Sequence, residues 1–176
     1  AALAPELAAF LEEGEPPIAV TMGTANPSSA AVYRAVIAAA ERLGRRVLVL
    51  TRHAEGLPDP LPGHALQVVY APFGQVFPRC AAIVHHGGVG TMAQGLRAGV
   101  PQGIVALAHD QYDNATRLER LGCGVGLTSR TATVPRLTRV LGALLRSPNV
   151  AAACRSAAAR FADDPQGEVV LRRYVE

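Results

Sequence analysis

The sequence predicts an α/β fold in which a doubly wound parallel sheet carries helices on both of its faces. Three observations predict this fold. Short apolar runs lack the alternation of a half-exposed strand, which is typical of strands buried on both faces. Amphipathic segments with helical spacing separate these runs, as in successive βαβ units. Glycine-rich or polar residues follow several of the runs, at the strand ends where such sheets bind ligands.

Six short apolar or β-rich runs predict the strands. Glycine, proline or polar residues bound most of them, which sets their length. The predicted strands lie at residues 18–21, 46–50, 67–70, 81–84, 103–107 and 125–127. The Pro- and Gly-rich residues 55–63 are predicted to form a loop between two strands.

Helices are predicted where helical spacing lies between a start signal and a stop signal. Pro27, Ser28 and Ser29 can cap the second helix and Gly44 ends it, while Thr133 caps a later one. The predicted helices lie at residues 5–12, 30–43, 91–98, 113–121, 133–145, 149–162 and 166–175.

The length of 176 residues suits one globular domain. The run Gly-Glu-Pro-Pro at residues 14–17 breaks the first helix, so we interpret residues 1–16 as the tail of a linker. Residues 17–176 then form the domain.

Composition and charge exclude several classes of protein. No apolar run reaches the roughly 18 residues of a membrane span, and the acidic start lacks the basic region of a signal peptide, so we expect a cytoplasmic protein without a membrane span. The net charge of +3 comes from arginines spread along the chain, since lysine is missing. A nucleic-acid-binding protein would cluster its cations, so no nucleic acid is expected as a partner.

The cysteines predict neither a disulfide framework nor a metal site. Cys80, Cys123 and Cys154 are odd in number, widely spaced and without a C-x-x-C pair. We expect them to be small buried apolar side chains.

Residues 85–91, His-His-Gly-Gly-Val-Gly-Thr, follow a predicted strand and open a helix. Glycines let a diphosphate approach the backbone, and the start of a helix favours negative charge. Thr91 adds a hydroxyl donor, and one histidine adds a donor that can carry charge. The glycines could equally serve a tight turn beside histidines satisfied in the core, so the turn alone leaves both interpretations open.

Asp110 and Gln111 form a second polar cluster at the end of the next predicted strand. A carboxylate beside an amide suits several sugar hydroxyls, because Asp accepts hydrogen bonds and Gln both accepts and donates them. An Asx-type cap for the following helix is the alternative.

Three blocks of sequence with fixed spacing carry a family resemblance. They read HHGGVGT at 85–91, LRAGVPQ at 96–102 and DQYDNATRLERLGCGVGL at 110–127. They closely resemble the donor-binding signature of nucleotide-sugar glycosyltransferases, a superfamily that includes plant natural-product glucosyltransferases and bacterial antibiotic and macrolide glycosyltransferases. The blocks are most similar to bacterial members that glycosylate polyketides, glycopeptides or sterol-like acceptors. A weaker resemblance extends from about residue 17 to the C-terminus.

The resemblance implies the GT-B architecture, in which two Rossmann-like domains face each other across a cleft. The N-terminal domain binds the acceptor, and the C-terminal domain binds the nucleoside-diphosphate sugar. This chain matches only the second domain. We therefore expect residues 17–176 to be the nucleotide-sugar (donor) binding domain, with the N-terminal acceptor domain absent from this chain.

The same resemblance implies a phosphate site at the glycine turn. His86 matches the family histidine that donates to the donor phosphates, and Gly88, Gly90 and Thr91 occupy the phosphate-loop positions. Thr24, after the first strand, matches a Gly-Ser/Thr element that also reaches the diphosphate.

Base and ribose contacts are implied for a second group of residues. Plant members have Trp-x-Pro-Gln where this chain has Tyr-Ala-Pro-Phe. Tyr70 keeps a face that can stack on the base and Ala71 a backbone contact, although an aromatic residue at the core edge of a strand is the alternative. Phe73 departs from the Gln of the motif. Gln94 replaces the Glu that grips the ribose hydroxyls, and it can hydrogen-bond without charge assistance.

The resemblance assigns the sugar to Asp110 and Gln111, which match the sugar-contacting pair. His109 precedes them and is expected at the sugar or at the other domain. Asn114 and Arg117 belong to the same motif, but helix packing explains them equally well.

The implied reaction is the attack of an acceptor hydroxyl or amine on the anomeric carbon of a UDP- or dTDP-type sugar, with inversion and without a metal or cofactor. The general base of the family is a histidine on the N-terminal domain, so no catalytic residue is expected in this chain. The partners implied are the nucleotide-sugar donor, the acceptor domain in cis or in trans, and a small-molecule acceptor, which the resemblance implies to be a natural product.

Two other functions remain open. The chain could be a stand-alone nucleotide-sugar-binding module that needs a separate partner subunit for the acceptor. A nucleotide-sugar epimerase of related two-domain architecture is the third possibility, but the carboxylate-rich site of such enzymes is not evident in the sequence.

Overall fold

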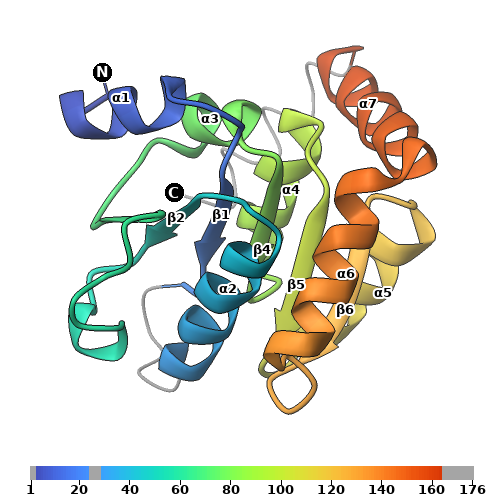
Figure 1. Ribbon diagram of the computed structural model, residues 1–176. Coiled ribbons are helices and arrows are strands. Elements are labelled where there is room, and N and C mark those ends of the chain that lie inside the picture. Colours follow the sequence, from blue (N-terminus) through green and yellow to red (C-terminus); the bar gives the residue numbers. More distant parts are fainter. Residues whose placement is uncertain (1–2, 24–28, 164–176) are drawn as a thin grey trace.

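Six short segments form the strands of one parallel sheet in the computed structural model, which describes residues 3–23 and 29–163 (Figure 1). The strands are β1 (Ile18–Thr21), β2 (Val47–Leu50), β3 (Ala65–Val68), β4 (Ala82–His85), β5 (Gln102–Ala106) and β6 (Gly124–Thr128). Every residue of β1, β2, β4 and β5 is buried, which explains why these strands read as unalternating apolar runs.

Helices cover both faces of the sheet, as Figure 1 shows. The α-helices are α1 (Pro5–Glu12), α2 (Ala30–Arg42), α3 (Phe73–Val76), α4 (Val89–Ala98), α5 (Gln111–Arg120), α6 (Val134–Arg146) and α7 (Pro148–Asp163), and short 3-10 turns lie at η2 (Ala54–Gly56) and η3 (Phe77–Arg79). One face packs against α2 and α6, and the other against α1, α3, α4 and α5, while α7 packs on α4. The predicted α/β, doubly wound fold is confirmed.

The strand order β3-β2-β1-β4-β5-β6 places a topological switch point between β1 and β4. From these two central strands the chain proceeds outward in opposite directions, so the loops that leave their carboxyl ends diverge and open a crevice. Thr21 at the end of β1 is the register partner of His85 at the end of β4. The histidine and glycine run therefore begins at the position where such sheets bind ligands.

The structure differs from the sequence prediction at several boundaries. The third strand ends at Val68, so Tyr70 lies in the loop beyond it. Helix α5 begins at Gln111, two residues early, because the Gln111 side chain binds the preceding backbone and starts the helix there. Helix α3 was not predicted, since four residues that include a glycine give no helical period. The predicted helix at 166–175 lies outside the described residues.

Helix α1 packs onto the sheet rather than standing apart from it. Leu7 and Leu11 are buried in a cluster with Phe77 of η3 and with apolar residues of the central strands. The Arg46 guanidinium lies 4.6 Å from the centre of the Phe10 ring. The boundary at residue 17 remains a prediction from the sequence, but the core of the domain extends across it.

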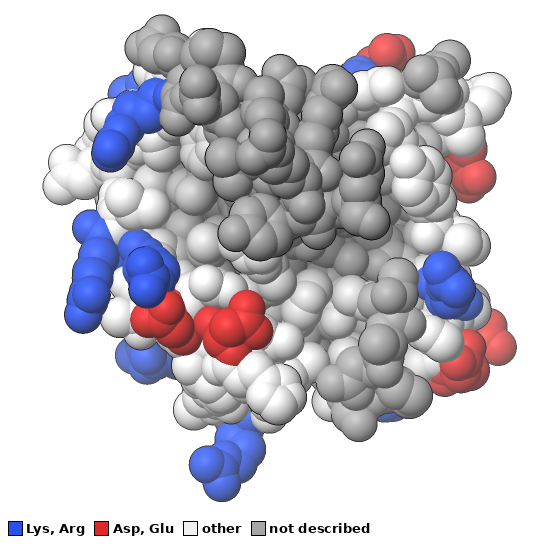
Figure 2. Space-filling model, turned by 180° about the vertical axis from the view of Figure 1, so that it is seen from behind, with Lys and Arg blue, Asp and Glu red and all other residues white. Residues whose placement is uncertain are grey.

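The described surface carries arginines in separate groups. On the face shown in Figure 2, blue arginine groups lie apart from one another, and some adjoin red acidic residues. All three cysteines are free and buried, as predicted. Within the described ranges, none of the helices combines the length and apolar character that crossing a membrane requires.

Truncating Leu7 tests the contribution of α1 to the domain. Leu7 is 2% exposed, so Leu7→Ala leaves a cavity and should lower the free energy of unfolding by about 2–5 kcal/mol. Urea unfolding followed by circular dichroism measures the change, and the exposed Glu13→Ala serves as the control on the same segment. If Leu7→Ala were as stable as Glu13→Ala, α1 would be an appendage and not part of the core.

Candidate functional site

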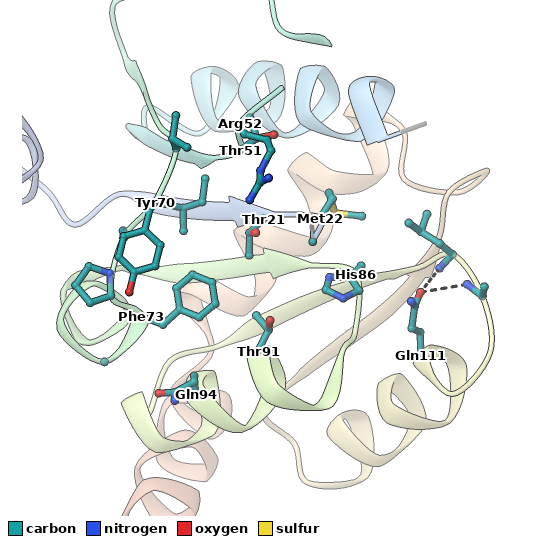
Figure 3. Close-up of a pocket in the computed structure, with 18 residues that line it drawn as sticks. Thr21, Met22, Thr51, Arg52, Tyr70, Phe73, His86, Thr91, Gln94 and Gln111 are labelled. Atoms are coloured by element: carbon teal, nitrogen blue, oxygen red, sulfur yellow. Dashed lines mark hydrogen bonds between the residues drawn. The ribbon is translucent and has the colours of Figure 1, made fainter. Parts of the chain in front are cut away.

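A cleft of about 850 Å³ opens at the carboxyl ends of the strands, above the switch point (Figure 3). Its lining comes from the segments that follow β1, β2, β3, β4 and β5 and from the first turns of α4. Figure 3 shows Tyr70 and Phe73 at one end, Gln111 at the other, and His86 and Thr91 between them. The cleft therefore has the length to hold a ligand that extends across several strands.

His85, the last residue of β4, precedes His86 in the chain but is not among the residues that line the cleft. Its side chain is fully buried, and its Nδ1 accepts a hydrogen bond of 3.1 Å from the backbone N–H of Gly87. Because Nδ1 is the acceptor, the ring proton lies on Nε2, which donates to Gln102 Oε1 at 2.8 Å. Gln102 in turn donates from Nε2 to the Met92 carbonyl at 3.2 Å. His85 is thus the satisfied core histidine, and it is not available to a ligand.

The surroundings of His85 keep its ring neutral. Burial lowers the pKa of His85 to about 4, against a smaller upward effect of the Gln102 hydrogen bond and a further lowering by His86. Protonation would also place a hydrogen on Nδ1, opposite the Gly87 N–H. The network therefore holds only with the uncharged imidazole.

The glycines of the turn make room for His86. Gly87 has a φ of +95°, and a Cβ there would lie 2.8 Å from Ile104 Cγ2. A Cβ on Gly88 would lie 2.6 Å from Nε2 of His86, and one on Gly23 would lie 3.2 Å from Cε1 of the same ring. The His86 imidazole is thus held between two bare backbone segments, and a side chain at Gly88 would displace it.

His86 lines the cleft with a half-buried ring. Its Nδ1 is enclosed and has no hydrogen-bond partner among the described residues, so Nε2 is the nitrogen left to meet a ligand. Burial lowers the pKa of His86, while the Asp110 carboxylate and the backbone of Thr21 act in the opposite direction. An anion in the cleft would add to the upward effects and favour the charged imidazolium.

Thr91 and Gln94 line the cleft from the first turns of α4. Gly88 is the N-cap of this helix and has no side chain to satisfy the free N–H groups, and a Cβ on Gly90 would meet nothing within 4 Å. The start of α4 therefore presents open backbone donors next to the Thr91 hydroxyl. Thr24, the remaining predicted phosphate contact, lies outside the described residues.

Tyr70, Ala71 and Phe73 form the other end of the cleft. Tyr70 is 80% exposed and lies beyond β3, so the alternative of an aromatic residue at the core edge of a strand is wrong. Ala71 is buried, and Phe73 stacks on Phe77 with ring centroids 4.4 Å apart. Tyr70 thus offers an open aromatic face above a fixed hydrophobic base.

Gln111 and Asp110 are adjacent in the sequence, but only Gln111 lines the cleft. Gln111 lines the cleft, but its Oε1 accepts the N–H groups of Leu107 at 2.8 Å and Ala108 at 3.1 Å. Only its amide N–H groups remain for a ligand, so the expectation that Gln111 also accepts is not met in this arrangement. Asp110 is exposed, is not among the residues that line the cleft, and makes no side-chain cap to α5, although it is the N-cap residue.

His109 and Asn114 flank this pair. His109 is exposed, is not among the residues that line the cleft, and has a φ of 54°, a left-handed conformation that non-glycine residues adopt at a cost and that clusters at functional sites. Asn114 is buried and donates from Nδ2 to the Gly87 carbonyl at 2.9 Å and to Asp110 Oδ2 at 3.1 Å. Asn114 therefore joins α5 to the glycine turn, whereas Arg117 is exposed and pairs with Asp113.

Sequence reasoning missed the contribution of β2 to the cleft. Thr51 and Arg52 follow this strand, and both line the cleft together with Thr21 and Met22 of the β1 end. The rule that ligands meet the carboxyl ends of strands would have found them, because residues 46–50 were predicted as a strand. In the part of the chain that the structure describes, no cluster of three or more His, Cys, Asp or Glu side chains could hold a metal ion.

A six-stranded sheet of this order with a ligand cleft at its switch point defines a Rossmann-like binding domain. The family can also be named. The model of the family "Erythromycin biosynthesis protein CIII-like, C-terminal domain" matches residues 34–176, and the chain belongs to this family.

The curated relatives that the chain matches are named as glycosyltransferases. O-mycaminosyltylonolide 6-deoxyallosyltransferase of Streptomyces fradiae is 46% identical over 121 residues, which are 67% of this chain and 28% of that protein. Vancomycin aglycone glucosyltransferase of Amycolatopsis orientalis is 38% identical over 144 residues, which are 81% of this chain and 35% of that protein. The chain spans about a third of the length of the curated relatives it matches.

Solved structures share the fold. Spinosyn rhamnosyltransferase SpnG superposes with a TM-score of 0.81 at 24% identity, over 100% of this chain and 48% of that one. The Streptomyces sp. SF2575 glycosyltransferase SsfS6, complexed with thymidine diphosphate, gives a TM-score of 0.71 at 25% identity over 92% of this chain and 42% of that one. The domain thus has the Rossmann-like fold of one half of GT-B glycosyltransferases.

The neutral state of His85 predicts how stability depends on pH. The unfolded chain binds a proton near pH 6.5 and the folded chain only near pH 4, so the free energy of unfolding should fall as pH drops through this window. The full loss for this one group is about 3 kcal/mol. Urea unfolding at several pH values measures it.

Two variants separate His85 from the other groups that titrate. His85→Gln should be less stable at pH 7 but should lose less further stability between pH 6.5 and 5, whereas His86→Gln should keep most of the wild-type slope. Identical slopes in the wild type and in His85→Gln would show that His85 does not titrate as the buried network requires.

Proposed function

We propose that this chain binds a nucleoside-diphosphate sugar of the UDP or dTDP type, as the donor half of an inverting glycosyltransferase that acts on a small natural product. The observation that carries the proposal is the cleft itself. It combines an exposed aromatic face at Tyr70 with the open N-terminus of α4 and the half-buried imidazole of His86. The family and the neighbour with bound thymidine diphosphate support the same ligand class.

In the proposed complex the ligand lies along the row of strand ends. The base stacks on Tyr70 with Ala71 and Phe73 beside it, and Gln94 reaches the ribose. The diphosphate meets His86, Thr91 and the N–H groups of the α4 start. The sugar then lies near Gln111, with His109 and Asp110 at the mouth of the cleft.

In the proposed reaction, this domain forms no covalent bond to the substrate and acts by stabilising the leaving group. A lone pair of the acceptor forms a bond to the anomeric carbon from the side opposite the diphosphate, and the bond from that carbon to the phosphate oxygen breaks with its electron pair. Charge develops on the leaving diphosphate, where the His86 imidazolium and the α4 N-terminus stabilise it without a metal ion or cofactor. The acceptor proton passes to a base on the acceptor domain.

The acceptor domain is proposed as a partner in cis or in trans. The curated relatives are about three times the length of the matched segment, which leaves room for a second domain in those proteins. On this chain Val89 at the start of α4 and Tyr112 at the start of α5 are 59% and 48% exposed. Large exposed apolar side chains on helices that contribute to a cleft suit burial against a second domain.

Replacing His86 tests the proposed diphosphate site. His86→Ala should weaken binding of UDP or dTDP by roughly ten- to hundredfold, because a hydrogen bond to a charged group is worth about 1.5–3 kcal/mol. Isothermal titration calorimetry of the folded chain measures the affinity.

The control is His53→Ala, which removes a histidine outside the cleft that pairs with Glu55. This variant should bind like the wild type, and His85→Ala should lose stability rather than a ligand contact. Failure of the folded wild-type chain to bind any UDP or dTDP nucleotide would reject the proposed function, and equal affinities of His86→Ala and His53→Ala would reject the role of His86.

A further inference from the structure

Arg52 brings a full positive charge into the cleft. It follows β2, and it is the one arginine among the described residues that line the cleft, where no aspartate or glutamate accompanies it. A guanidinium stays protonated at any physiological pH, whereas burial lowers the pKa of His86. Among the described residues that line the cleft, Arg52 is therefore the one whose side chain is charged whether or not a ligand is bound.

None of the described residues pairs with the Arg52 guanidinium. Arg45, Arg79 and Arg117 pair with acidic residues. Arg52 forms no hydrogen bond or ion pair within the described part of the chain, and the nearby Glu55 carboxylate bonds to His53 instead. All five N–H donors of Arg52 are thus available to an anion.

The position of Arg52 lies between the two ends of the cleft. In Figure 3 its side chain points from the end of β2 toward Thr21, with Tyr70 on one side and His86 on the other. Tyr70 offers an aromatic face on which a base could stack. His86 lies near the start of α4, where the phosphate contacts are proposed. A ligand that joins these two sites would share the cleft with the Arg52 side chain, which lines it between them in this view.

We infer that Arg52 is a binding residue for the diphosphate of the donor and that it supplies the positive charge which draws the nucleotide into the cleft. This inference rests on the proposed function and assigns Arg52 to the phosphates rather than to the base. Partial positive charge at the α4 N-terminus amounts to about half an elementary charge. The diphosphate carries several negative charges, so the guanidinium is the larger counter-charge.

Comparing nucleotides with nucleosides tests the assignment. Binding of UDP, dTDP, uridine and thymidine is measured by calorimetry, in displacement format for the weaker ligands, at low and high salt. Arg52→Gln should weaken binding of the diphosphates by roughly ten- to hundredfold and leave the nucleosides within about twofold, because only the phosphates lose a charge-assisted contact. The salt dependence of diphosphate binding should also become shallower.

Two further variants complete the experiment. Arg52→Lys keeps the charge and should retain more diphosphate affinity than Arg52→Gln, which separates the charge from any effect on folding. Arg139→Gln removes an exposed arginine on α6 outside the cleft lining and should bind all ligands like the wild type.

Each contrary result has a distinct meaning. Wild-type affinity of Arg52→Gln for the diphosphates would overturn the inference and leave the proposed function intact. An equal loss for nucleosides and diphosphates would overturn it too, because Arg52 would then contact the base or ribose. A folded wild-type chain that binds none of these nucleotides would reject the proposed function, and the inference with it.

Discussion

The buried hydrogen bond between His85 and Gln102 holds together the elements on which the cleft depends. It joins the end of β4 to the first residue of β5, and the second bond of Gln102 reaches the backbone of α4 at Met92. A Cβ on Gly95 would lie 2.5 Å from the Gln102 side chain, so α4 approaches β5 closely only because residue 95 is glycine. Breaking one link of such a network leaves a buried polar group without a partner, at a cost of about 1–3 kcal/mol.

The two adjacent histidines divide between structure and binding because successive residues at a strand end face different surroundings. His85 is the last residue of β4 and faces the core, where hydrogen bonds with Gly87 and Gln102 fix its tautomer. His86 is the first residue beyond the strand and turns into the cleft, where its Nδ1 has no partner within the described residues. The buried, neutral ring of His85 therefore has a structural role, while the ring of His86 is the one that an anion in the cleft could bring to the charged state.

The sequence predicted most of this arrangement, and its failures have physical causes. Unalternating apolar runs located β1, β2, β4 and β5, because every residue of these strands is buried, whereas short β-rich runs located the partly buried β3 and β6. Helix α3 was not predicted because it is too short to show a helical period. Arg52 carries no motif, and only its position at the carboxyl end of a predicted strand indicates a place in the cleft. Nothing local in the sequence distinguishes His85 from His86 either, because their difference depends on Gln102, which lies 17 residues away.

The two ends of the cleft differ in how much of the ligand they can specify. Under the proposed function, the phosphate end has an imidazole, a hydroxyl and free helix N–H groups, and all of them are directed at one kind of group. At the sugar end, the side-chain carbonyl of Gln111 already accepts two backbone N–H groups of the preceding loop. One carboxylate oxygen of Asp110 accepts a hydrogen bond from Asn114. Sugar hydroxyls both donate and accept, so a site left mainly with amide N–H donors there discriminates poorly between them. Under the proposed function, selection among sugars must therefore draw on groups beyond this lining, such as the exposed His109, whose φ is 54°, and the proposed acceptor domain.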